Sequence, residues 1–447
     1  MMRHTFVSVL RRTGLAAVLA AALTPPAAPQ SAQQKAGDDD IDRRVAAVMP
    51  QVITWRRDFH EHPELGNREV RTQKIVADYL RSLGMDVRTD IAKTGVVGVL
   101  RGGKPGGVVA LRSDMDALPV AEQVDLPFKS TVRSTYAGQD VGVMHACGHD
   151  AHMAMLMGAA TVLAGMRAQL PGTVKFLFQP AEEGPPPGER GGAVLMIEGG
   201  ALENPAPTAI FGLHVWPEEA GKLSFKPGAE MSMADGLNII VKGKQTHGAQ
   251  PWKGVDPVVI SAEIVTALQT ITARQTDITL APAVVTVATI NGGVRGNIIP
   301  DSVVMTGTIR TFDTGMREDI HTRIKRTAEL IAQASGATAT VSFGGASGSV
   351  PVYNDPALLT RMMPTITRVA NGKINPNAVW MPSEDYSLYQ KKIPGLFLFL
   401  GVNKPGVKPD DAAPNHSPYF FVNEDALPVG VKALAGMAYD YLAGGGK

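Results

Sequence analysis

The sequence predicts an α/β fold into which a second, smaller α+β domain is inserted. Continuous apolar runs at 108–112, 173–179 and 209–213 are typical of strands buried on both faces of a sheet. Residues 151–166, rich in Ala, Met and Leu, predict a buried helix between the first two strands. Between 233 and 343 the pattern changes, and 447 residues are too many for one ordinary core. We therefore expect two domains.

The elements before these strands follow from simple periodicity. Helical spacing predicts one helix over 41–59, before Pro63, and a second, amphipathic helix over 69–83. Short apolar runs predict strands at 85–88 and 96–101. Together with the three buried strands, these elements form the first part of the main domain, which we place at 41–232.

The inserted domain, placed at 233–346, has its own order of elements. Two helices alternate with four strands in the order β-α-β-β-α-β, a split βαβ or ferredoxin-like sandwich. The second part of the main domain follows at 347–447 and includes a buried strand at 396–400. The expected elements of the insert are strand 236–241, helix 256–273, strands 283–290 and 302–311, helix 317–334 and strand 338–343.

The N-terminal 32 residues have the pattern of an export signal. Arg3, Arg11 and Arg12 precede an apolar run at 14–23, and a Pro/Ala-rich stretch follows it. The apolar run is too short to span a bilayer as a mature helix. We expect cleavage, no membrane anchor, and delivery to the periplasm or medium by the Sec or twin-arginine route. Residues 33–40 are interpreted as a disordered leader.

Composition narrows the possible partners. The chain is 44% hydrophobic and 19% charged with a net charge of +1, so nothing indicates nucleic-acid binding. It has one cysteine, Cys147, which cannot form an intrachain disulfide. In an exported protein a lone thiol is expected to be buried or bound to metal.

Cys147 lies two residues before His149, with Gly148 between them. Thiolate and imidazole are ligands that zinc-like ions prefer, and on an extended turn with a glycine both side chains can face one ion. The alternative is a small buried cysteine beside a capping or core histidine. Alone, the C-x-H pattern does not decide between them.

Acids and imidazoles recur where the predicted buried strands end. Asp114 and Asp116 follow the first strand, Glu182 and Glu183 the second, and His214 the third. Ligands of α/β sheets bind beyond the carboxyl ends of the strands. Adjacent carboxylates differ in direction, so one can bind metal while the other faces a substrate. A turn or a helix cap would explain Asp114 and Asp116 by themselves, but three such strand ends are hard to explain by packing.

This ordered set of motifs resembles the aminoacylase/carboxypeptidase metallopeptidase family, and within it the hippurate hydrolases and auxin-conjugate amidohydrolases. The resemblance runs from about residue 56 to the C-terminus. It implies a catalytic domain with a central mixed sheet and an inserted satellite domain for closure or dimerisation. The motifs are Asp-Met-Asp-Ala-Leu-Pro (114–119), Met-His-Ala-Cys-Gly-His-Asp (144–150), Gln-Pro-Ala-Glu-Glu-Gly (179–184), Gly-Leu-His-Val-Trp-Pro (212–217) and Pro-Asn-His-Ser-Pro (414–418).

The resemblance implies two divalent ions, such as zinc, manganese, cobalt or nickel. Glu182 would be the general base, and Asp116 would orient a ligand histidine. Two such ions can polarise a carbonyl and activate water, and a free glutamate can carry the water's proton to the leaving amine. The implied metal ligands are Cys147, His149, Glu183, His214 and His416.

In the satellite domain the resemblance implies a substrate-facing His247 and substrate-binding Asn297 and Arg310. From the residues alone, His247 would be read as an exposed loop histidine and Arg310 as a surface strand residue. Trp252 stands where relatives have a histidine, which puts the polarity of that pocket in doubt. The resemblance also implies domain closure and a homodimer or homotetramer.

The sequence therefore predicts an exported metal-dependent amidohydrolase that cleaves N-acyl amino acids or short peptides. Two alternatives stay open: a periplasmic solute-binding protein without turnover, and a thiol hydrolase that uses Cys147 with His149. His60 and His62 are ligands by residue type, but at a helix terminus we expect them to contact free carbonyls.

Overall fold

A computed structural model describes residues 32–344 and 350–446, with side chains from residue 37. Apart from Ala32, the predicted export signal lies outside the described residues. The expectation of a disordered leader at 33–40 is wrong, because helix α1 spans Ala32–Glu61. Asp38 is buried and forms an ion pair with Arg368 (2.7 Å). This ion pair thus helps to anchor the start of the helix. No helix within the described residues is long and apolar enough to cross a membrane.

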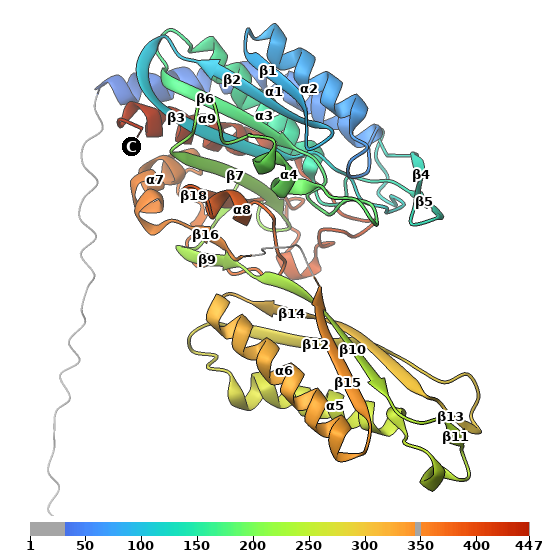
Figure 1. The fold of residues 1–447 in the computed structure, drawn as a ribbon. Helices are drawn as coiled ribbons and strands as arrows, with labels where there is room; N and C mark the ends of the chain where they lie inside the picture. The colour runs from blue at the N-terminus through green and yellow to red at the C-terminus, as the bar shows by residue number, and fades with distance from the viewer. Residues whose placement is uncertain (1–31, 345–349, 447) are drawn as a thin grey trace, which may run out of the picture.

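The catalytic domain contains an eight-stranded mixed sheet, as expected from the sequence (Figure 1). Its centre is parallel: β3 pairs with β6 and β7, and β7 with β18. The strands in spatial order are β1 (Asp86–Ile91), β2 (Gly95–Arg101), β6 (Pro171–Gln179), β3 (Lys104–Asp114), β7 (Ala209–Trp216), β18 (Gly395–Gly401), β8 (Leu223–Ser224) and β17 (Ile374–Asn375).

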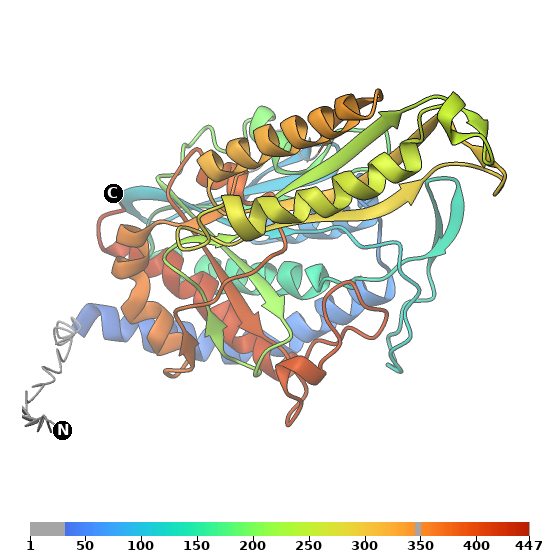
Figure 2. The same ribbon diagram turned by 90° about the horizontal axis from the view of Figure 1, so that it is seen from below.

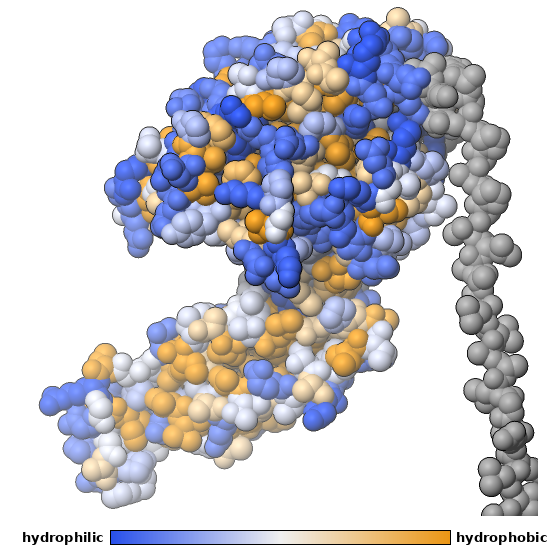
Figure 3. Space-filling view, turned by 180° about the vertical axis from the view of Figure 1, so that it is seen from behind, coloured by the Kyte–Doolittle hydropathy of each residue, from blue (hydrophilic) through white to orange (hydrophobic). Residues whose placement is uncertain are grey.

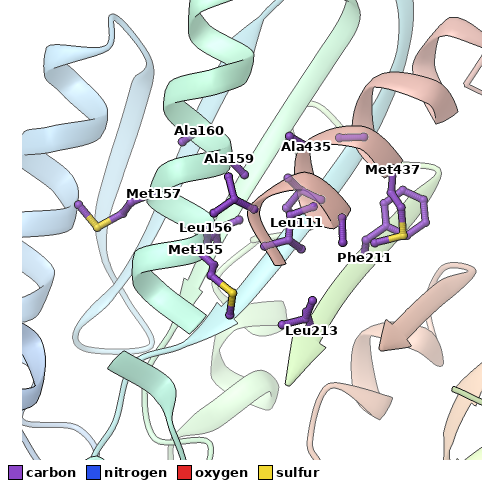
Figure 4. Packing of buried hydrophobic residues seen from close by; sticks show 14 of the residues in the cluster. Leu111, Met155, Leu156, Met157, Ala159, Ala160, Phe211, Leu213, Ala435 and Met437 are labelled. Atoms are coloured by element: carbon purple, nitrogen blue, oxygen red, sulfur yellow. The ribbon is translucent and has the colours of Figure 1, made fainter. Parts of the chain in front are cut away.

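Helices cover both faces of this sheet because its central strands are apolar on both. The larger core joins one face to α1, α2 (Val70–Ser82), α3 (His149–Gly165), α7 (Pro356–Val369) and α9 (Leu427–Ala443). In Figure 4, Leu111 of β3 and Phe211 and Leu213 of β7 lie against residues of α3 and α9. A smaller core joins the other face to α4 (Gly192–Glu198) and α8 (Ser387–Gln390).

The satellite domain has the element order expected from the sequence. A four-stranded antiparallel sheet has the order β12-β14-β10-β15. Two helices pack on one face of it (Figure 2) through a separate apolar core. The elements are β10 (Met233–Lys242), α5 (Pro257–Thr270) continued by a π-helical turn (Ile271–Gln275), β12 (Ala283–Asn291), β14 (Ser302–Thr311), α6 (Thr314–Ala334) and β15 (Thr338–Gly344).

Figures 1 and 3 show the satellite domain standing apart from the catalytic domain, with apolar residues gathered on the satellite surface seen from behind. The chain leaves and re-enters the catalytic domain beside a two-stranded pairing of β9 (Gly228–Met231) and β16 (Val352–Asn354). A second small pairing, of β11 (Thr246–His247) and β13 (Ile298–Ile299), lies at the far tip of the satellite. The hairpin of β4 (Arg133–Tyr136) and β5 (Gln139–Gly142) was not expected.

Candidate metal centre

A tight loop brings Cys147 and His149 to the carboxyl edge of the sheet. Gly148 between them has φ +88°, and a Cβ there would lie 2.3 Å from Val215 Cγ2. Only glycine permits this backbone so close to β7. Helix α3 begins at His149, and both ligand candidates are buried.

The ring of His149 is fixed in one orientation by Asp116. Its Nδ1 lies 2.8 Å from the Asp116 carbonyl oxygen and 3.3 Å from Oδ1 of the same residue. Nδ1 therefore donates, which leaves Nε2 as the ring nitrogen that can face a metal. That Nε2 is buried and has no hydrogen-bond partner among the described residues. An unpartnered imidazole nitrogen of this kind is a ready metal ligand.

His214 is oriented in the same way at the end of β7. Its Nδ1 donates to the Val215 carbonyl (2.7 Å), and its Nε2 lies 3.4 Å from Cys147 Sγ. The nearby His152 is different, because both its ring nitrogens are engaged. Nδ1 contacts Asp114 Oδ1 (2.6 Å), and Nε2 accepts from the Val215 amide (2.8 Å). His152 is therefore a structural residue of the site.

The adjacent glutamates are held by their backbone amides. Asp116 accepts from the amide of Glu182 with Oδ1 and from that of Glu183 with Oδ2, both at 3.0 Å. Ala181 before them has φ +50°, and its amide donates to the buried Glu69 (2.9 Å). The carboxylates then diverge. Glu182 Oε2 lies 3.9 Å from His149 Nε2, and Glu183 Oε1 lies 2.9 Å from His416 Nε2.

His416 reaches the site on a loop that is bonded to the cysteine loop. Its own amide donates to the Ala146 carbonyl (2.8 Å), and its backbone has φ +71°. The side-chain amide of Asn415 donates to the carbonyls of Cys147 (3.2 Å) and Val215 (3.3 Å). These contacts join the cysteine loop to a segment that the chain reaches only after the satellite domain.

The structure thus brings together all five predicted metal ligands. Cys147 belongs to two of the groups of donor atoms found here, one with His149 and His214 and one with Glu183 and His416. Three groups of donor atoms within 4.8 Å of one another consist of predicted ligands and Glu182: Cys147, His149 and His214; Cys147, Glu183 and His416; and His149, Glu182 and Glu183. Two further groups are Asp114, His149 and His152, and Glu182, Glu384 and Asp385.

The charges of the cluster fit a cation. Burial, with Glu183 and Glu182 adding to it, raises the pKa of the Cys147 thiol well above its usual range. Burial lowers the pKa of His149, but Asp114 and Asp116 outweigh it and raise the pKa to about 10. The thiol and the His149 ring therefore hold their protons because carboxylates surround them. Divalent ions would replace these protons and ionise the thiol.

One buried arginine lies beneath the site and was missed from the sequence. Arg112 contacts Asp114 Oδ2 (2.8 Å), Glu384 Oε1 (2.9 Å) and Asp385 Oδ1 (3.1 Å), and its Nε donates to Gln179 (3.0 Å). The signal was present as an arginine at the end of an otherwise apolar run.

A cavity of about 310 Å³ opens above the ligands. Trp216 forms part of its wall, with its ring 4.6 Å from that of Trp380 and 5.5 Å from that of Phe399. The wall therefore combines metal-binding groups with aromatic surface. The lining residues are Cys147, Glu182, Glu183, His214, Trp216, Met231, Pro382, Ser383, Glu384, Pro414, Asn415 and His416.

The predicted satellite residues are only partly brought to this cavity. Arg310 Nη1 donates to Ser383 Oγ (3.3 Å) on the cavity wall. His247 and Asn297 are exposed and lie together at the satellite tip, where Figure 1 shows β11 and β13. Trp252, which is 75% exposed, belongs to a short helix (Pro251–Lys253) that contacts β11. None of the residues lining the cavity belongs to the satellite domain.

The two histidines at the end of α1 differ. His62 Nδ1 lies 3.0 Å from the Asp58 carbonyl, as expected for a helix terminus. The same expectation is wrong for His60, which contacts Asp150 Oδ2 (2.7 Å) and Glu122 Oε1 (3.0 Å). It is buried among carboxylates because α1 packs against the start of α3.

Comparison with known proteins agrees with this geometry. The family model "Peptidase family M20/M25/M40" matches residues 110–440. Thermostable carboxypeptidase 1 of Saccharolobus solfataricus is 39% identical over 90% of this chain and 98% of its own. IAA-amino acid hydrolase ILR1-like 4 of Arabidopsis thaliana is 40% identical over 88% of this chain and 86% of its own.

A solved structure is similar over nearly the whole chain. The Bacillus subtilis YxeP protein, a dinuclear metal binding peptidase from the M20 family, superposes with a TM-score of 0.73. It is 34% identical and is matched over 89% of this chain and 99% of its own. With the family model matching most of the chain, the protein belongs to peptidase family M20/M25/M40 and is a metal-dependent amidohydrolase.

Proposed function

We propose that the protein hydrolyses the amide bond of N-acyl amino acids or short peptides with two divalent ions at the Cys147 site. The main observation behind this proposal is that Cys147 Sγ belongs to two groups of donor atoms, one with His149 and His214 and one with Glu183 and His416. A carboxypeptidase and an amino-acid conjugate hydrolase among the relatives support an amide next to an amino acid.

Glu182 is the general base of this reaction. When bound, the ions polarise the scissile carbonyl and lower the pKa of water. Glu182 lies against His149 and shares a group of donor atoms with His149 and Glu183. No such group joins it to His214 or His416. Burial, followed by the charges of Glu384 and Glu183, raises its pKa well above the usual range. Such a carboxylate readily takes the proton of water and passes it to the leaving nitrogen.

The substrate has a defined direction in the cavity. The leaving nitrogen must approach Glu182, so the amino-acid half lies on the side of Glu384 and Ser383. Arg310 contacts Ser383 there, and its guanidinium suits the α-carboxylate of that half. The acyl half then lies toward Trp216, which favours flat or bulky apolar acyl groups such as benzoyl or indoleacetyl.

His247 and Asn297 complete the site only after movement. Both are at the satellite tip, remote from the cavity, so they reach the substrate by domain closure or from a second copy of the chain (Figure 1). A homodimer or homotetramer is consistent with either arrangement. Sedimentation of the purified protein, with and without a product analogue, measures both assembly and closure.

The test of the proposed function begins with metal content and turnover. Elemental analysis should find up to two transition ions per chain, and the loaded protein should cleave members of an N-acyl amino acid panel. Glu182→Gln should keep the metals and lose ~10²–10⁴-fold in turnover. Glu183→Gln should instead weaken metal binding. Identical behaviour of the two variants would contradict the assignment of roles.

Neither alternative explains the site as well. A thiol hydrolase needs a thiolate, but burial and two glutamates raise the pKa of Cys147, and His149 is turned toward Asp116. A solute-binding protein has no need of adjacent glutamates held in divergent directions. Activity that survives complete chelation would support the thiol hydrolase. Binding without turnover in metal-loaded protein would support the solute-binding protein.

Export is part of the proposal. It rests on the arginines and the apolar run of the first 32 residues, as read from the sequence. N-terminal sequencing of protein from periplasm or medium should begin near residue 32. Lysines in place of Arg11 and Arg12 distinguish the twin-arginine from the Sec route.

A further inference from the structure

Glu384 is a carboxylate of the metal cavity that is neither one of the five ligand candidates nor the general base. It precedes α8, is 5% exposed and lines the cavity beside Glu182. One oxygen, Oε1, accepts from Arg112 Nη2 (2.9 Å) and from the Tyr386 amide (3.0 Å). The other oxygen, Oε2, accepts no hydrogen bond from any residue that the structure describes. Half of the carboxylate is fixed, and the other half is available to a ligand.

The position of Glu384 relative to Glu182 indicates which ligand. Carboxylate oxygens of Glu182, Glu384 and Asp385 lie within 4.8 Å of one another. A nitrogen within hydrogen-bond reach of Glu182, at about 3 Å, can therefore also donate to Glu384. Asp385 cannot compete for it, because its oxygens are bonded to Arg112, Gln179 and the Ala193 amide.

A third metal ion is a poorer occupant of this place than an N–H donor. Arg112 is fully buried and already contacts both Glu384 and Asp385, so its charge opposes another cation. The chain neighbour of Glu384 also supports an amino-acid ligand, since Ser383 contacts Arg310. An acceptor for the amide nitrogen thus lies beside the proposed site of the α-carboxylate.

We propose that Glu384 is a further catalytic residue whose free oxygen accepts a hydrogen bond from the nitrogen of the scissile amide. The inference rests on the proposed function and deepens it. When Glu182 delivers its proton, the C–N bond breaks, its electron pair stays on nitrogen, and the amine leaves. Glu384 stabilises the positive charge that the nitrogen gains before that bond breaks, and it forms no bond itself.

An ester probe separates this role from a structural one. Glu384→Gln keeps an oxygen for Arg112 and Tyr386 and turns an NH₂ group toward the cavity in place of the free oxygen. The probes are the N-acylglycine cleaved fastest among acetyl, benzoyl and indoleacetyl forms, and the glycolate ester of the same acid. The ester has no N–H, and its leaving oxygen does not become positive.

For Glu384→Gln we expect kcat on the amide to fall about 10–100-fold and kcat on the ester to stay within about 3-fold. Metal content should equal that of the wild type. Asp385→Asn is the matched control: it perturbs the same arginine but offers the cavity no free oxygen, so amide and ester should lose equally.

Equal losses on amide and ester for Glu384→Gln would overturn the inference and leave the proposed function intact. Loss of metal from Glu384→Gln would also overturn it, because Glu384 would then be a ligand. If loaded wild-type protein cleaves no amide of the panel, the proposed function fails first, and the inference fails with it.

Discussion

Replacing Asp116 by asparagine should damage the metal centre more than any other single conservative change away from the ligands. Both carboxylate oxygens of Asp116 accept hydrogen bonds from backbone amides, those of Glu182 and Glu183, at 3.0 Å. Its carbonyl fixes the ring of His149. Asparagine keeps one acceptor, but its NH₂ group must then face one of the two amides.

The size of the effect follows from those contacts. One charge-assisted hydrogen bond to a buried amide is lost and the other weakened, at ~1.5–3 kcal/mol for a bond to a charged group. We expect the metal-free Asp116→Asn protein to lose about 2–4 kcal/mol of unfolding free energy. Disturbing a group that orients ligands typically costs 10–100-fold in metal affinity, so we expect a loss of about that size.

Denaturant unfolding of the metal-free protein measures the first quantity, and competition with a chromophoric chelator measures the second. Asp140→Asn is the control, because its carboxylate pairs with Arg133 (2.7 Å) at an exposed hairpin. It should change stability by less than about 1 kcal/mol and leave metal affinity unaltered. An Asp116→Asn protein with wild-type metal affinity and turnover would refute the orienting role.

Three further outcomes are expected. Cys147→Ser should lower both metal content and turnover, and full retention of both in elemental analysis and assay would exclude a bridging sulfur. Arg310→Ala should raise KM sharply for substrates with a free α-carboxylate and little for their amides, whereas equal effects would make Arg310 structural. Burial raises the pKa of Asp235, but hydrogen bonds from His321 and Arg317 outweigh it and lower the pKa to about 2. Asp235→Asn should therefore cost up to about 2 kcal/mol at neutral pH, and its difference from wild type in thermal unfolding should fade between about pH 4 and pH 2, since the depressed carboxylate stabilises only while ionised.

The catalytic sheet could be predicted from the sequence because its strands carry local signals. The apolar runs that became β6 and β7 end in Glu182, Glu183 and His214, so strand and site were found together. The cysteine loop needed the family resemblance as well, because a C-x-H pattern has a structural explanation. His416 could be assigned only by resemblance, since nothing local shows that its loop bonds to Ala146.

What the sequence could not supply are the partners of buried charges. Arg112 reads as the end of an apolar strand, and its acids Glu384 and Asp385 come more than 250 residues later. Glu69 supports the turn before Glu182 from the start of α2, a contact without any sequence pattern. The leader was misread for the same reason, because Asp38 has its partner on α7.

The two halves of the proposed site are built by different means, and this difference separates metal binding from substrate selection. Every ligand candidate is oriented within the catalytic domain: His149 by Asp116, His214 by Val215, and His416 by the loop bonded to Ala146. In the described part of the chain, His247 and Asn297 lie at the satellite tip, and Arg310 contacts the catalytic domain through Ser383. Changes in the satellite should therefore alter which amides are cleaved without altering metal affinity. The converse does not hold, because any loss at the cysteine loop removes the chemistry for every substrate.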